Sequence, residues 1–142
     1  MDVCVFCRPY DDQGALRIRL ETDAYYLILA DIQSGRFLPV ISPAHYAEAA
    51  SIHEVRERNQ LMELFRRLDR HQVFEMDGIN VRAEQLIAEG FGVADAYHLA
   101  CAEMNSDVFI SCDDALLRRA AKIKLAVEIF NPVEFALKEE LR

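Results

Sequence analysis

The chain has 142 residues, a length that fits one domain spanning residues 1–142 with a core of its own. No apolar run approaches the roughly 20 residues needed to cross a bilayer, and no signal peptide is visible. We therefore expect a cytoplasmic protein without a membrane partner. The net charge of −8 excludes a protein that grips nucleic acid through its overall charge, because such proteins are usually basic.

The N-terminal half is predicted to be mainly helical. Leucine and isoleucine recur at three- and four-residue steps over 15–34, which predicts a helix there, with a stop at the following glycine. Residues 37–42 form an apolar run typical of a buried strand, although Pro39 restricts it to an edge. Ser42 followed by proline predicts the start of a second helix, and an amphipathic helix is expected over 54–71.

The C-terminal half alternates helices and strands. We expect, in chain order, a turn at Asp77-Gly78, a helix over 80–89, a helix over 93–105, a strand over 108–111, a helix over 114–122, a strand over 127–130 and a last helix capped by Asn131-Pro132. Strands alternating with helices imply an α/β sandwich with a largely parallel sheet, in which ligands bind at the carboxyl ends of the strands.

Two acids stand at the ends of these core elements. Asp95 lies in the first turn of its helix, and Asp113 directly follows the strand over 108–111. Asp107 precedes the same strand, so roughly 13 Å or more separates it from Asp113, and only one of them can belong to a given site. Asp114 is expected to cap the next helix. Buried carboxylates need a neutralising partner, and several converging carboxylates suit a hard divalent cation.

Two further acids lie in apolar surroundings nearer the N-terminus. Glu48 stands among alanines on its helix, where by itself it is more often a solvated residue than a ligand. Asp2 precedes the apolar run Val3-Cys-Val-Phe6. Asp95 could likewise be an ordinary acid at a helix start, where it would interact favourably with the helix dipole.

The spacing of Asp2, Glu48, Asp95 and Asp113 on a chain of this length resembles the PIN domain family. The similarity is clearest in Val93-Ala-Asp-Ala-Tyr-His-Leu-Ala-Cys-Ala102 and in Asp107-Val-Phe-Ile-Ser-Cys-Asp113, and the closing Ile129-Phe-Asn-Pro-Val-Glu-Phe135 also looks like the end of such domains. The resemblance covers essentially the whole chain.

The resemblance implies a three-layer α/β/α fold with a central, mostly parallel sheet. It also implies a magnesium- or manganese-dependent ribonuclease, with Asp2, Glu48, Asp95 and Asp113 as the acidic metal ligands and Ser111 as the family's hydroxyl residue. Many bacterial members are toxins of VapC type that a cognate antitoxin inhibits. RNA would be cut by in-line hydrolysis, leaving 5′-phosphate and 3′-hydroxyl ends, with one metal or two. Arg8 and the group Arg118, Arg119 and Lys122 would hold backbone phosphates, or would form solvated faces.

One departure from the family pattern concerns the first acid. Family members usually have an apolar strand before it, whereas Asp2 follows Met1 directly. Either the deduced start is late or the first strand is reduced to its tail, and so short a strand would position Asp2 less firmly.

Other interpretations remain open at this stage. Cys4-Val-Phe-Cys7 could be a redox pair or half a zinc site, although no second pair stands at zinc-finger spacing. His98 is expected to be a hydrogen-bonded core residue and His45 a surface residue. A PIN-like domain with a poorly held first acid could also bind RNA or a protein without cutting, and the apolar helices could form a homodimer.

Overall fold

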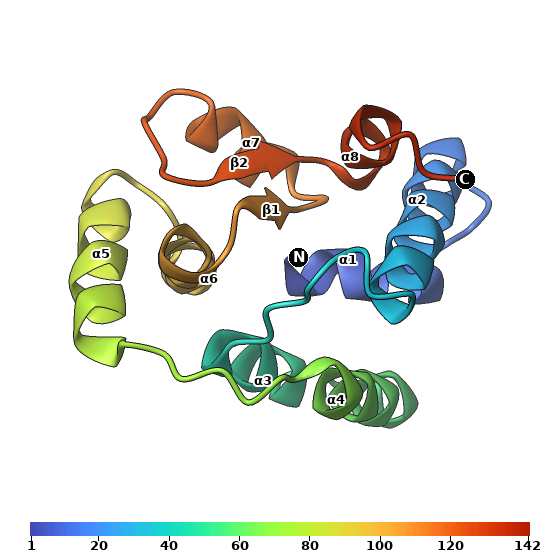
Figure 1. Ribbon diagram of the computed structural model, residues 1–142, viewed down its shortest axis with the longest axis horizontal. Coiled ribbons are helices and arrows are strands. Elements are labelled where there is room, and N and C mark those ends of the chain that lie inside the picture. Colours follow the sequence, from blue (N-terminus) through green and yellow to red (C-terminus); the bar gives the residue numbers. More distant parts are fainter.

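The structure, a computed structural model, describes all residues from 1 to 142 (Figure 1). It is mainly helical, and its elements in chain order are α1 (Val3–Cys7), a 3-10 helix (Arg8–Tyr10), α2 (Leu16–Gln33), α3 (Pro43–Ala50), α4 (Val55–Leu68), α5 (Met76–Ala88), α6 (Val93–Asn105), β1 (Val108–Ile110), α7 (Asp114–Ala120), β2 (Glu128–Phe130) and α8 (Pro132–Lys138). None of these helices combines the length and the apolar character that crossing a membrane requires.

The predicted three-layer α/β/α sandwich is wrong. The sheet consists of β1 and β2 alone, which pair in parallel with Val108 opposite Glu128 and Ile110 opposite Phe130. The run 37–42, predicted as a strand, is extended but unpaired, and Pro39 has no N–H to offer a ladder. The apolar segment after Asp2 is the short helix α1, so no strand lies there either.

The helix predictions hold better because their starting signals are local. At the start of α3, the Ser42 side chain accepts a hydrogen bond from the N–H of His45, and the His45 side chain accepts one from the N–H of Ser42. These two bonds form a capping box, and Pro43 occupies the first helical position. Asn131 and Glu134 do the same for α8. The predicted turn at Asp77-Gly78 is wrong: both residues lie in the first turn of α5, where their N–H groups are bound by the carboxylate of Glu75.

Two clusters of buried apolar side chains form the core. One joins α1, α2, α4 and the end of β1, and includes Phe6, Ile28 and Phe65. The other joins α5, α6, α7 and β1, and includes Leu86 and Leu99. In Figure 1, α1 and α3 lie between the end of α2 and the α6–β1 segment, so residues of α1, α3, α6 and the end of β1 can meet where the two clusters join.

A candidate acidic metal site

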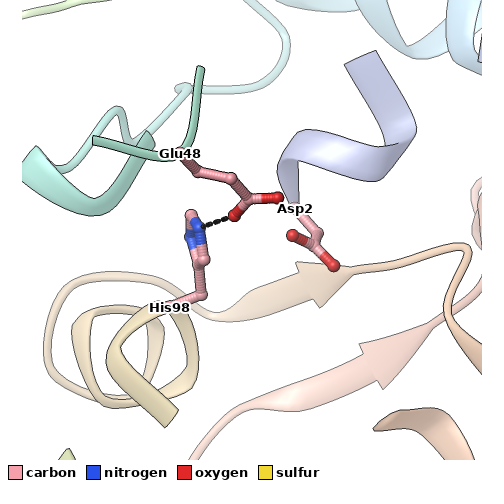
Figure 2. A group of neighbouring side chains, drawn as sticks. All are labelled: Asp2, Glu48 and His98. Atoms are coloured by element: carbon pink, nitrogen blue, oxygen red, sulfur yellow. Dashed lines mark hydrogen bonds and ion pairs between the residues drawn. The ribbon is translucent and has the colours of Figure 1, made fainter. Parts of the chain in front are cut away.

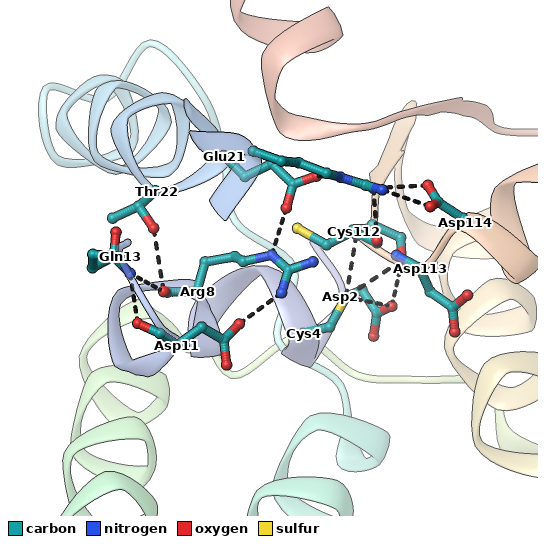
Figure 3. A network of polar contacts seen from close by, with 12 residues as sticks. Asp2, Cys4, Arg8, Asp11, Gln13, Glu21, Thr22, Cys112, Asp113 and Asp114 are labelled. Atoms are coloured by element: carbon teal, nitrogen blue, oxygen red, sulfur yellow. Dashed lines mark hydrogen bonds and ion pairs between the residues drawn. The ribbon is translucent and has the colours of Figure 1, made fainter. Parts of the chain in front are cut away.

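Asp2 is held firmly at the centre of this junction. Its N–H donates a 2.7 Å hydrogen bond to the carbonyl of Ile110, and its side chain is only 6% exposed. The hydroxyl of Ser111 donates to its Oδ2 at 2.7 Å. The thiol of Cys4 donates to the same oxygen at 3.1 Å (Figure 3). Because both bonds fall on one oxygen, Oδ1 keeps its lone pairs for another partner. The expectation that a missing strand would leave Asp2 loose is therefore wrong.

Glu48 and His98 approach Asp2 from two different helices. Figure 2 shows Glu48 on α3 facing His98 on α6, with Asp2 beside them. His98 Nε2 lies 2.7 Å from Glu48 Oε2, and one ligand atom from each of the three residues fits within 4.8 Å of the others. A divalent ion bound between the carboxylates of Asp2 and Glu48 would fit that spacing.

His98 is buried as the sequence predicts, and its surroundings fix its tautomer. The Nδ1 atom is buried without a hydrogen-bond partner, so a proton there would be left unsatisfied in the interior. The proton therefore sits on Nε2, which donates to Glu48. This bond orients the Glu48 carboxylate, and it leaves Oε1 of Glu48 for another ligand.

His45 is not the surface residue that the sequence suggested. It is buried, its Nδ1 accepts from the N–H and hydroxyl of Ser42, and its Nε2 lies 2.7 Å from the carbonyl of Met1. Its ring stands edge-on to His98, with the ring centroids 4.8 Å apart. Burial, and then the neighbouring His98, lower the pKa of His45 well below its usual value, so it is a neutral support for the Met1–Asp2 backbone.

Asp95 links the remaining acids to this group. It is half-buried in the first turn of α6, and burial raises its pKa above the usual value. The negative charges of Asp2, Asp113 and Glu48, in that order, raise this pKa further. The charges of the other three predicted acids therefore act on Asp95, whereas the residues that converge within ligand distance are Asp2, Glu48 and His98, without Asp95 and Asp113.

The acid that caps α7 is not the predicted one. Asp113 caps α7, because its Oδ1 accepts from the N–H groups of Ala115 and Leu116, and its side chain is exposed. Asp114, expected to be that cap, instead forms an ion pair with Arg17. Asp107 lies at the other end of β1 and borders a different part of the molecule, as the strand length predicted.

The predicted phosphate-binding residues lie in unlike surroundings. Arg8 is largely covered, and two of its nitrogens already bind Glu21 and Asp11. Arg118 is exposed on α7, at the helix whose start Asp113 caps. Ser111 is fully buried and serves Asp2 rather than facing solvent.

The cysteines do not form a redox or zinc site of the usual kind. All four are free, and Cys101 and Cys112 are buried. A hydrogen bond with Cys112 and then burial raise the pKa of Cys4, while burial raises the pKa of Cys7 to about 12. Thiols of this kind stay protonated near neutral pH, which argues against thiolate chemistry.

A cavity of about 750 Å³ lies apart from the acids. The segment 36–42, α6 and β1 line it, and its walls are largely apolar. His98 borders this cavity, whereas Asp2, Glu48, Asp95 and Asp113 do not. The acid cluster and this cavity are therefore separate features, and His98 is the residue of the cluster that borders both.

Two contributors to the site escaped the sequence analysis. His98 was expected to be a hydrogen-bonded core residue and Cys4 to belong to a possible redox or zinc pair, yet each binds an acid of the cluster. No local pattern could have shown this for His98, because Glu48 is 50 residues away.

Comparisons with protein-family models, with curated proteins and with solved structures found no match for this chain.

Proposed function

We propose that this protein is a metal-dependent ribonuclease that hydrolyses RNA phosphodiester bonds, acting as the toxin of a toxin–antitoxin pair. The toxin role and the antitoxin partner rest on the resemblance of the acidic motifs to PIN domains of VapC type. The chemistry rests on the acid cluster. The observation that supports it most is the convergence of Asp2, Glu48 and His98 within 4.8 Å. The charges of Asp2, Asp113 and Glu48 also raise the pKa of Asp95.

The donor set fits a hard divalent cation. Asp2 Oδ1 and Glu48 Oε1 are carboxylate oxygens whose partner oxygens are already fixed by hydrogen bonds. Such fixed carboxylates bind magnesium or manganese through oxygen, with waters filling the remaining positions. The acidic neighbours of Asp95 oppose its ionisation. A bound cation would offset their negative charge and favour the ionised form of Asp95.

Each of the four acids would have a role in holding the metal or the attacking water. Asp2, Asp95 and Asp113 would hold the metal, and Glu48 would bind it or orient the attacking water, with His98 fixing its carboxylate. When bound, a divalent cation lowers the pKa of water and offsets the charge that develops on the phosphate. Attack of the water oxygen on phosphorus breaks the bond to the 3′ oxygen, which takes up a proton and leaves as the 3′-hydroxyl.

Substitution of two acids tests the proposal. We expect Asp95→Asn and Asp113→Asn each to abolish magnesium-dependent cleavage of a single-stranded RNA, while the circular dichroism spectrum is unchanged. Asn caps a helix about as well as Asp, so α7 should keep its start in Asp113→Asn. Cleavage retained in both variants would overturn the site.

Asp107→Asn is the matched control. Asp107 is an exposed aspartate at the opposite end of β1, and we expect its substitution to leave cleavage unchanged. Titration with manganese separates the enzyme from a binding module that does not cut, because only a catalytic site needs to bind the metal.

A further inference from the structure

A buried carboxylate on α2 holds two arginines side by side. Glu21 is only 3% exposed, and its Oε2 accepts from Arg8 Nε at 2.5 Å (Figure 3). Its Oε1 accepts from Arg17 Nε at 2.8 Å. Each oxygen of one buried carboxylate thus holds one guanidinium group in direction.

Arg17 reaches from α2 to the turn that follows β1. Its Nη1 and Nη2 bind the two carboxylate oxygens of Asp114 at 2.6 and 2.7 Å, a two-pronged contact that sets both distance and angle. Its Nη2 also lies 3.4 Å from the carbonyl of Cys112. One side chain, oriented by Glu21, thus contacts two residues of the turn 111–114.

The same turn supplies the acidic site. Ser111 donates its hydroxyl proton to Asp2 and accepts a hydrogen bond from the N–H of Asp113 at 3.1 Å. On the opposite side, the N–H of Cys112 is bound by the sulfur of Cys4 at 3.2 Å. A shift of this turn would move the Asp113 carboxylate and the hydroxyl that fixes Asp2 together.

We infer that Glu21 and Arg17 are positioning residues for the proposed metal site. Glu21 directs Arg17, and Arg17 holds the turn 111–114 in the position at which Asp113 and Asp2 bind the cation. Neither residue contacts the metal or the RNA. The inference rests on the proposed function, because it assumes that these acids bind a metal.

Manganese affinity is the measurement that tests this role. We expect Arg17→Gln and Glu21→Gln each to weaken manganese binding by about 10–100-fold, the usual cost of losing a residue that orients a ligand. Arg17→Lys keeps the positive charge but loses the two-pronged contact with the Asp114 carboxylate, and so should not restore the manganese affinity. The dissociation constant is measured by electron paramagnetic resonance on the full-length chain.

A second buried ion pair of the same kind gives the matched control. The side chain of Glu103 on α6 is 7% exposed, and its Oε2 lies 2.6 Å from Nε of Arg82 on α5. This ion pair does not involve the turn 111–114. We expect Glu103→Gln to lower the Tm about as much as Glu21→Gln does, and to leave manganese affinity unchanged. A merely structural role for Glu21 would give two variants with equal affinities.

The possible outcomes separate this inference from the proposed function. If the wild-type chain binds no manganese, the proposed site itself fails. If the wild type binds and Arg17→Gln binds equally well, the positioning role fails alone. A higher KM for RNA in Arg17→Gln with unchanged manganese affinity would also overturn it, and would make Arg17 a phosphate contact. Arg17 is half-exposed, so this variant remains decisive even if Glu21→Gln does not fold.

Discussion

The hydroxyl of Ser111 lies 2.7 Å from Oδ2 of Asp2, although the two residues are 109 positions apart in the sequence. Both residues are buried, and the bond joins the start of α1 to the end of β1. Because the donor fixes one carboxylate oxygen, the other is directed towards Glu48 and His98. This contact couples the packing of the chain to the geometry of the proposed metal site.

Removing that hydroxyl should weaken metal binding. In Ser111→Ala, Asp2 loses a hydrogen bond to a buried charged group, worth about 1.5–3 kcal/mol. We expect manganese affinity to fall by about tenfold or more and the Tm to fall as well. Calorimetric titration and thermal melting measure the two effects. Ser106→Ala is the control, since Ser106 donates its hydroxyl to the carbonyl of Ala102 within α6, and should leave the affinity unchanged.

Loss of the imidazole at position 98 should release Glu48. His98→Phe fills the buried space but removes the hydrogen bond to Glu48 Oε2. We expect manganese to bind about 10–100-fold more weakly, because the carboxylate is no longer oriented. His53→Phe, at an exposed position, should bind as the wild type does. Unchanged affinity in His98→Phe would show that Glu48 needs no support from α6.

Asp95 should make the metal-free fold less stable as the pH rises. Its pKa is raised by burial and then by Asp2, Asp113 and Glu48, so the folded state binds the proton more tightly than the unfolded chain does. The stability that this group contributes is present below the unfolded pKa of about 3.9 and is lost as the pH rises through the folded value. Asp95→Asn cannot ionise, and should have the higher Tm at pH 7 in a chelating buffer.

Two further measurements check the sign of this effect. The difference in Tm between Asp95→Asn and the wild type should shrink as the pH falls, because Asp95 of the wild type then becomes protonated. Saturating manganese should reverse the order at pH 7, because a ligand that binds the folded state stabilises it. A lower Tm for Asp95→Asn at pH 7 without metal would contradict the prediction.

Local chemistry made much of the secondary structure predictable. The helix starts at Ser42-Pro43 and Asn131-Pro132 depend on hydrogen bonds within four residues, so the sequence contains all of their determinants. The strands β1 and β2 follow from short apolar runs. The run 37–42 has the same composition but no partner, and pairing is a property of two segments, which composition cannot decide.

Three features of the candidate site could be predicted from the sequence: Asp95 at a helix start, Asp113 at the end of a strand, and the exclusion of Asp107 by strand length. The burial of Asp2, its two hydrogen bonds, and the contact between His98 and Glu48 became visible in the folded chain alone. The two groups of features differ in the distance along the chain over which their causes act. Caps and strand ends depend on neighbours in the chain, whereas the orientation and ionisation of a carboxylate depend on groups that packing brings to within a few ångströms.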